Sequence, residues 1–575
     1  MAWTPDDAPW WTRAVVYQVY PRSFADSDGD GIGDLRGVLT HLDHLVELGV
    51  DVVWLSPIYR SPQDDNGYDI SDYTDVDPMF GTLADLDELI AALHERGIRL
   101  VMDLVVNHTS DEHAWFVESR SSRDNPKRDW YWWRPAREGM ATGAPGAEPN
   151  NWGSFFSGSV WELDDATDEY YLHLFSRRQP DLNWENPQVR QAVHAMMRWW
   201  LDRGVDGFRM DVINAISKAP GLPDGEVHGG AHGDGSPHYL HGPRLHEFLA
   251  EMHREVFAGR PDRLLTVGEM PGVTIDEGRL FTDPARREVD MVFQFEHVGL
   301  DHGPGGKFDP RPLRLADLKA SFGRWQAGLA ETGWNSLYWN NHDQPRIVSR
   351  WGDDGRWWRE SATLLATVLH LHRGTPYVYQ GEELGMTNAG FSSLDDYRDI
   401  ESVRHIAEAR AHGWATDEAL LAGLGAMSRD NARTPMQWDG SPHAGFTRGE
   451  PWLPATGNHT WLNAAAQRAD ERSVFHHYRR LIALRHAEPV VALGDFTMLL
   501  PDDEHVYAFT RRLVRAQGDD ELLVVANFSG EARAAEVDEE WAGAALVLGN
   551  YADAVGPESV PVRLRPWEAL VLRRG

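Results

Sequence analysis

Eight short, largely apolar segments alternate with helical patterns along the first 380 residues, and this alternation limits the fold more than any other feature. The segments begin at Ala14, Asp51, Ile98, Val205, Leu264, Val289, Asn335 and Thr375. Strands that are apolar on both faces belong to parallel sheets covered by helices. Eight such strands, each followed by a helix, predict an α/β fold in which the sheet closes into a (β/α)8 TIM barrel.

Two of the intervening helices carry clear end signals. In "LADLDELIAALHERG" the pair Thr82 and Asp85 predicts a capped start, and Gly97 predicts the end. The second pattern, "NPQVRQAVHAMMRWWLDRG", has Asn186 as cap, Pro187 at the first helical position and a terminating glycine. Both helices therefore have defined lengths between strands.

The spacing between strands is uneven at one place, and the texture changes near the C-terminus. The gap from the third to the fourth strand contains "RDWYWWRPAREG" and a Gly/Pro-rich stretch at 137–153. After Asp495, alternating runs such as "HVYAFTRRLV" and "ELLVVANFSG" replace the helical pattern. We predict a catalytic barrel at 1–108 and 181–492, an inserted subdomain at 109–180 and a C-terminal antiparallel β-sandwich at 493–575.

Composition narrows the possible partners. A net charge of −34 argues against nucleic acid and anionic membranes as partners. There is no cysteine, which excludes disulfides and thiolate chemistry. No long apolar stretch or signal-peptide pattern is present, so we expect a cytoplasmic protein. We also expect a monomer. The 25 tryptophans slightly favour a carbohydrate ligand, because aromatic faces stack on sugar rings.

The segment "GVDGFRMDVI" places Arg209 and Asp211 on the same face of an apolar strand. Taken alone, this is equally well explained as a structural ion pair. The carboxyl ends of the other strands decide between the readings, because they add His108, Glu269, and His342 with Asp343. Active sites of such barrels form at these strand ends. A merely solvated rim does not explain acids that follow such apolar runs.

Three carboxylates at one site suit the cleavage of an acetal with retention of configuration. One carboxylate attacks the anomeric carbon, and a second, kept protonated, donates to the leaving oxygen. Arg209 is expected to keep Asp211 ionised, as a nucleophile requires. Glu269 has no cation beside it in the sequence, so we expect a raised pKa that suits an acid/base. Asp343 would bind hydroxyls and stabilise the positive transition state.

Four segments, "DLVVNH", "GFRMDVI", "VGEM" and "NNHD", resemble the signature segments of glycoside hydrolase family 13, the α-amylase family. "QPDLNWENP", "TPYVYQGEELGMTN" and "NARTPMQW" are similar to its oligo-1,6-glucosidase and α-glucosidase branch. The resemblance implies Asp211 as nucleophile, Glu269 as acid/base and Asp343 as transition-state stabiliser. It further implies a blind, glucose-sized pocket and an exo-acting α-glucosidase capable of transglycosylation. The residues that would bind the terminal glucose are His108, Arg209, His342, Tyr68 as a stacking ring, and Asp65 paired with Arg433.

Val212, directly after the nucleophile, bears on the linkage. Family members that prefer α-1,6 bonds usually have valine there, although a β-branched strand residue needs no such explanation. We expect an α-1,6 preference. The alternatives are an α-1,4-preferring, maltose-type enzyme, a sucrose-acting or isomerising relative and, remotely, a non-catalytic member of the family.

"DSDGDGIGD" resembles a calcium-binding loop, with Asp26, Asp28, Asp30 and Asp34 and the carbonyl of Ile32 as ligands. The glutamate at position 12 of an EF-hand is absent, since Gly37 stands there. The alternative is a metal-free turn rich in Asp and Gly. We expect one structural Ca²⁺ or Mg²⁺ remote from the reaction, and no cofactor for the chemistry itself.

Overall fold

The computed structural model describes residues 3–260, 264–515 and 518–574, and eight parallel strands form its centre. Their order around the sheet is β11-β10-β9-β5-β2-β1-β15-β14. A parallel bridge between Val292 and Asn335 joins the two ends and closes the barrel. The predicted barrel is therefore confirmed. Its strands are β1 (Val16–Val19), β2 (Val52–Leu55), β5 (Arg99–Val105), β9 (Gly207–Asp211), β10 (Leu265–Glu269), β11 (Met291–Phe293), β14 (Ser336–Leu337) and β15 (Thr375–Tyr379).

Alternation along the strands fills the barrel on the inside and packs it against helices on the outside. Val16, Val52, Val101 and Val267 belong to one apolar cluster with the ring of Tyr377. Their chain neighbours point outward into a larger cluster shared with the helices. Because the lower interior is filled with apolar side chains, polar side chains of the strands collect at one end of the barrel.

The helices of the barrel begin and end where the sequence predicts. Thr82 and Asp85 form a capping box at the start of α3 (Leu83–Glu95), and Asn186 caps α5 (Pro187–Arg203). Gly204 ends α5 with φ of 116°, a conformation that favours glycine. The other helices around the barrel are α1 (Leu35–Thr40), α2 (Leu42–Leu48), α6 (Ser236–Tyr239), α7 (Leu245–Met252), α8 (Ile275–Phe281), α9 (Leu315–Gly328), α10 (Ile347–Trp351), α11 (Trp358–His370), α14 (Ala464–Ala469), α15 (Val474–Ala487) and α16 (Pro489–Leu493).

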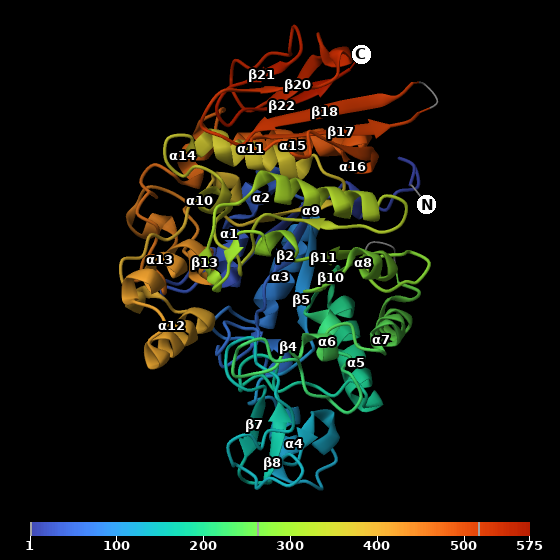
Figure 1. Cartoon of the computed structure of the whole chain (residues 1–575), viewed down its shortest axis with the longest axis vertical. Coiled ribbons are helices and arrows are strands. Elements are labelled where there is room, and N and C mark those ends of the chain that lie inside the picture. Colours follow the sequence, from blue (N-terminus) through green and yellow to red (C-terminus); the bar gives the residue numbers. More distant parts are fainter. Residues whose placement is uncertain (1–2, 261–263, 516–517, 575) are drawn as a thin grey trace.

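A separate lobe projects from one end of the barrel between β5 and α5 (Figure 1). It contains α4 (Ala114–Ser121) and a three-stranded antiparallel sheet of β6 (Trp133–Arg134), β8 (Glu169–Leu172) and β7 (Trp161–Asp164). These elements lie within the predicted inserted segment, 109–180.

Further elements outside the barrel repeat lie between β2 and β5, between β11 and β14, and after β15. They are α12 (Ile400–His412), α13 (Asp417–Met427) and two hairpins, β3 (Tyr59–Arg60) with β4 (Asp72–Val76), and β12 (His302–Gly303) with β13 (Gly306–Pro310). The helix α12 reaches the inserted lobe, because Arg404 donates to the carbonyl of Phe156 and Ser157 donates to Glu408.

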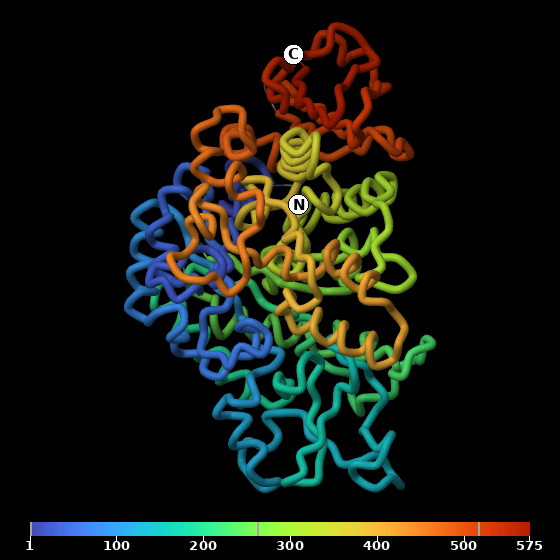
Figure 2. Tube along the Cα trace, turned by 90° about the vertical axis from the view of Figure 1, so that its left-hand side faces the viewer, coloured from blue at the N-terminus to red at the C-terminus, as the bar shows by residue number. Residues whose placement is uncertain are grey.

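The C-terminal region lies at the end of the molecule opposite the inserted lobe (Figures 1 and 2). Arg511, which is fully buried, donates to the carbonyls of Leu371 and Val491 and so ties this region to the barrel. The predicted antiparallel C-terminal β domain is confirmed. It has a five-stranded sheet of β16 (Asp495–Leu499), β17 (Val506–Leu513), β18 (Asp520–Asn527), β22 (Ala569–Arg573) and β20 (Ala545–Gly549), and a pair of β19 (Arg533–Ala535) and β21 (Val562–Leu564).

Within the ranges described, no helix combines the length and the apolar character needed to cross a bilayer.

Candidate active site

A pocket of about 270 Å³ opens at the carboxyl ends of the barrel strands. Asp211 is the last residue of β9 and Glu269 the last of β10, whereas Asp343 follows β14. The structure therefore brings the three predicted acids into one cavity. Its walls are formed by Asp65, Tyr68, His108, Phe155, Phe156, Phe175, Asp211, Val212, Glu269, Pro271, Phe295, Lys307, Asp343, Gln344, Glu401 and Arg429.

Arg209 is buried and contacts three carboxyl groups of the site. Its Nη1 lies 2.7 Å from Asp103 Oδ1 and 2.7 Å from Asp211 Oδ1, and its Nη2 lies 2.6 Å from Glu269 Oε1. The guanidinium is 1% exposed. One buried cation thus serves three carboxyl groups, and they cannot all be ionised without leaving a net negative charge inside the protein.

This imbalance of charge sets the pKa values. Burial raises the pKa of Asp211 to about 6, and Arg209 only partly offsets that effect. The contact with Arg209 was predicted, and a pKa of about 6 leaves Asp211 mainly ionised at neutral pH. The upward effect of burial on this pKa was not predicted. Burial raises the pKa of Glu269 further, to about 8, and the charge of Asp211 adds to the rise. The predicted direction for Glu269 agrees with this, although its contact with Arg209 was not expected.

Val212 has an unusual backbone conformation for a β-branched residue, with φ of 35° and ψ of 41°. Its N–H donates to Glu269 Oε2 at 3.0 Å. Such strained residues persist where the surroundings enforce them, often at functional sites. The turn after the nucleophile strand therefore holds the second carboxyl group in place.

Asp343 lies in a cationic setting. Arg429 Nε and Arg433 Nη2 each lie 2.9 Å from its Oδ1, and His342 Nε2 lies 3.2 Å from its Oδ2. Burial by itself would raise the pKa of Asp343, but the charges of Arg429 and Arg433 hold that pKa well below its ordinary value. This carboxylate stays ionised and can oppose a positive charge that develops on a substrate.

The pairing of Asp65 with Arg433 is wrong. Arg429 Nη2 lies 3.1 Å from Asp65 Oδ1, whereas Arg433 binds Asp343, Asp399 and the carbonyl of His342. The two arginines are four residues apart on one tight turn, and both point toward acidic groups. The sequence does not show which acid each one meets.

The remaining predicted residues lie at the same place. The Tyr68 and His342 rings stack with centroids 5.1 Å apart and an angle of 6° between their planes. His108 is buried, contacts the carbonyl of Tyr68 through Nε2 at 3.1 Å, and burial lowers its pKa to about 4. Uncharged histidines and a tyrosine face can bind a neutral polar ligand such as a sugar.

Several pocket residues were missed from the sequence. Asp103 could have been found, because it is a lone acid in an apolar strand and lies directly opposite Arg209 in the β5–β9 ladder. Gln179 donates to Asp65, and Lys307 of β13 forms an ion pair with Glu401 of α12 at 2.6 Å. These residues come from segments far apart in the chain that carry no local signal.

The predicted metal loop is formed in part. Single carboxylate oxygens of Asp26, Asp28 and Asp34 lie within 4.8 Å of one another, and Asp30 is not in this group. Asp30 instead accepts from the N–H of Ile32. An all-oxygen set of three acids fits a hard cation such as Ca²⁺ or Mg²⁺.

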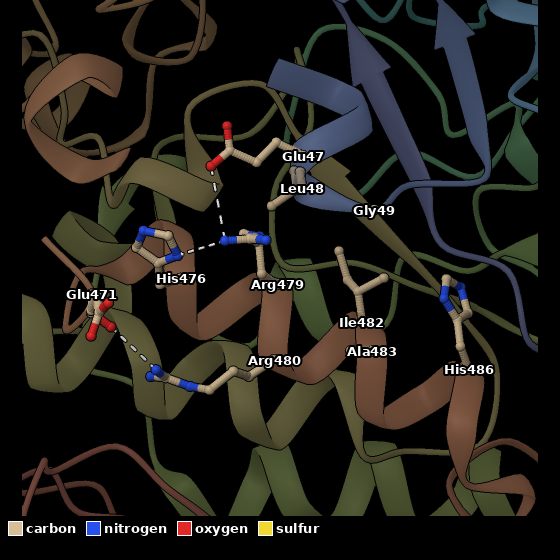
Figure 3. Close-up of a pocket in the computed structure, with 10 residues that line it drawn as sticks. All are labelled: Glu47, Leu48, Gly49, Glu471, His476, Arg479, Arg480, Ile482, Ala483 and His486. Atoms are coloured by element: carbon tan, nitrogen blue, oxygen red, sulfur yellow. Dashed lines mark hydrogen bonds and ion pairs between the residues drawn. The ribbon is translucent and has the colours of Figure 1, made fainter. Parts of the chain in front are cut away.

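A larger depression, of about 500 Å³, lies between α2 and α15 on the outside of the barrel (Figure 3). Its charged groups contact one another: Arg479 lies 3.8 Å from Glu47 and 2.9 Å from His476. Arg480 donates to the backbone carbonyl of Glu471. No group of acids converges on this groove within the described residues, so size alone does not mark the site of chemistry.

Barrel fold, strand-end acids and aromatic walls define a carbohydrate-type pocket, and the comparisons place the chain in a family. Residues 18–494 match the model "Alpha amylase, catalytic domain". The chain therefore belongs to the α-amylase family, glycoside hydrolase family 13, and the predicted resemblance is confirmed.

Similar proteins extend over the whole length. An oligo-1,6-glucosidase of Parageobacillus thermoglucosidasius is 56% identical, with 98% of this chain and 99% of the relative aligned. A trehalose-6-phosphate hydrolase of Bacillus subtilis is 46% identical, with 99% of each aligned. In the crystal structure of trehalulose synthase from Pseudomonas mesoacidophila, TM-score 0.91 and identity 43%, 99% of this chain and all of that chain superpose.

Proposed function

We propose that this protein is an exo-acting, retaining α-glucosidase that removes single glucose units from the non-reducing ends of short α-glucosides. The observation that carries the proposal is the shared contact of Asp211 and Glu269 with Arg209. Asp211 and Glu269 also hydrogen-bond to each other, and this lowers the pKa of Asp211 against the effect of burial. Carboxyl groups in direct contact suit a retaining mechanism, with its ~5–5.5 Å separation, better than an inverting one, which leaves ~6.5–9.5 Å for a water molecule.

In this mechanism the ionised Asp211 attacks the anomeric carbon, and Glu269 gives its proton to the leaving oxygen. The resulting glucosyl–Asp211 ester is then attacked by water, from which Glu269 removes a proton. Asp343, held ionised by Arg429 and Arg433, opposes the positive charge of both transition states. A sugar hydroxyl in place of water gives transglycosylation.

We infer an exo-acting mode from the contacts of Asp65, which would close one end of the pocket. Asp65, bound by Arg429 and Gln179, lines it together with Tyr68 and His108. This pair of opposite charges offers hydrogen-bonding groups for the hydroxyls of one terminal glucose.

An α-1,6 preference is part of the proposal. It is supported by Val212 in the pocket wall and by the similarity to oligo-1,6-glucosidases. Lys307 in the wall is neutralised by Glu401, which suits an uncharged second sugar better than a phosphorylated one.

The test is one kinetic panel of isomaltose, maltose, kojibiose, nigerose, trehalose, sucrose and trehalose 6-phosphate. We expect the highest kcat/KM for isomaltose, and α-glucose as the first product by proton NMR. A higher kcat/KM for maltose or trehalose 6-phosphate than for isomaltose would show that the enzyme does not prefer α-1,6 bonds. β-Glucose as first product would refute retention, and no turnover of any sugar would refute the function.

Three further properties belong to the same proposal. One Ca²⁺ or Mg²⁺ would bind Asp26, Asp28 and Asp34, so removal of divalent cations should lower the free energy of unfolding by about 2–3 kcal/mol while kcat is kept.

The protein would be a monomer, as checked by light scattering. It would be cytoplasmic, in agreement with the absence of cysteine, as checked by cell fractionation.

A further inference from the structure

Gln18 is the only side-chain amide in β1 and is 1% exposed. Its Nε2 lies 2.8 Å from His342 Nδ1 and 3.1 Å from Ser56 Oγ. Both N–H bonds of the amide thus have an acceptor within the barrel. Gln18 does not line the pocket, so its contact with the site runs through His342 alone.

The aromatic neighbours of His342 determine the plane of its ring but not its direction. Tyr68 stacks on one side at 5.1 Å, and Tyr20 is nearly parallel at 6.1 Å. An imidazole turned by 180° in the same plane fills almost the same volume, and either nitrogen can hold the proton. Stacking therefore leaves two orientations and two tautomers available.

The polar contacts select one of these arrangements. Nε2 lies 3.2 Å from the carboxylate of Asp343, so it must carry a hydrogen. In the neutral ring Nδ1 is then the acceptor, and it needs a donor, which the amide of Gln18 supplies. The ring is neutral because burial lowers its pKa to about 3; of the charged groups that act on it, Asp343 raises that pKa, and Arg433, Arg209 and Arg429 lower it.

We propose that Gln18 is a positioning residue that fixes His342 as its Nε2–H tautomer and so keeps a donor directed at Asp343. The expected effect on turnover rests on the proposed function, whereas the tautomer itself does not.

Two substitutions of similar size test this role. Gln18→Met removes the donor, and we expect kcat/KM for isomaltose to fall about tenfold at every pH. Gln18→Glu places an acceptor there, so above neutral pH the proton moves to Nδ1 and kcat/KM falls further, about 100-fold. One added proton, on either the glutamate or the ring, restores Nε2–H. The activity of Gln18→Glu relative to wild type should therefore rise as the pH falls.

Gln294→Met is the matched control. Gln294 Nε2 lies 2.9 Å from His297 Nδ1, and both residues are buried, but His297 contacts the carbonyl of Tyr338 rather than an acid. We expect Gln294→Met to lose a similar amount of stability, and its activity relative to wild type should not depend on pH. An equal, pH-independent loss in all three variants would overturn the proposal, because it would show only a packing role.

The tautomer can be read without activity. Nitrogen-15 NMR of histidine-labelled protein, with His342 assigned from a His342→Gln sample, should show Nε2 protonated in wild type and Nδ1 protonated in Gln18→Glu at high pH. A wild-type ring protonated at Nδ1 overturns the proposal even if glucosidase activity is found. Nε2–H in a protein that turns over no glucoside would uphold it and refute the function instead.

Discussion

The pocket at the strand ends and the groove between α2 and α15 both contain arginine–carboxylate contacts, but these contacts differ in their exposure to solvent. In the pocket, Arg209 is 1% exposed and shared by three carboxyl groups. In the groove, Arg479 is 41% exposed and Glu47 is 27% exposed. Water therefore screens the groove charges far more than it screens Arg209 and the carboxyl groups that contact it.

This difference explains which depression can do chemistry. In the groove, Arg479 and Glu47 are partly exposed and lie 3.8 Å apart, so one cation meets one acid. In the pocket, burial without enough cations pushes the pKa values of Asp211 and Glu269 apart and upward, to about 6 and about 8. Two carboxyl groups with separated pKa values can act as nucleophile and acid at the same pH.

The largest effect is expected from Asp211→Asn. An amide cannot form the ester intermediate, so kcat should fall by about 10⁴-fold or more while the fold is kept. Initial rates on isomaltose and a thermal melt measure the two effects. Near wild-type rates would show that the nucleophile lies elsewhere.

Glu269→Gln should have the next largest effect. Loss of the proton donor should lower kcat/KM for isomaltose by about 10³-fold, but much less for an aryl glucoside whose leaving group needs no proton. Steady-state rates on both substrates give the ratio. An equal loss on both would contradict the role of acid.

The pH profile sharpens the comparison without any mutation. The reaction needs Asp211 deprotonated and Glu269 protonated, so log kcat/KM should fall below about pH 6 and above about pH 8, by about tenfold per unit. The two limits belong to the coupled pair. Glu269→Gln should lose the alkaline limb. A rate that stays level from pH 5 to 9 is the contrary result.

Arg429→Met removes the partner of Asp65 and one partner of Asp343. We expect kcat/KM to fall about 100-fold, together with weaker selection of a terminal glucose over a terminal xylose, because the closed end loses its pairing. Arg479→Met in the groove is the control. Unchanged selectivity would remove the argument for a closed pocket.

The smallest effect is expected from Glu47→Gln, which weakens the ion pairs with Arg468 and Arg479 in the groove. Partly exposed pairs contribute about 0–1 kcal/mol, so the free energy of unfolding should change by about 1 kcal/mol or less and kcat/KM should stay within about twofold. Denaturant unfolding and isomaltose kinetics test this. A tenfold loss of activity would contradict the conclusion that the groove takes no part in the reaction.

Much of the architecture was predictable because its signals are local. Strand alternation and helix end signals such as Thr82, Asn186 and Gly204 act within a few residues, so the barrel, both helix caps and the C-terminal β domain could be inferred. The rule that strand ends meet at one rim then brought Asp211, Glu269 and Asp343 together.

The contacts within the site were less predictable. Asp65 meets Arg429, 364 residues away, and not Arg433, because the path of two loops decides which side chain arrives. Arg209 appeared in the sequence as the partner of Asp211 alone, yet three strands bring carboxyl groups to it. Gln18 gave no sign of its contact with His342.

By itself the sequence determined the fold, the family and the acids at the rim, since periodicity and strand direction are properties of short segments. Only the tertiary structure decided how one buried arginine is divided among three carboxyl groups, and hence their pKa values. Burial and the geometry of charges depend on residues that are distant in the chain, and no short segment records them.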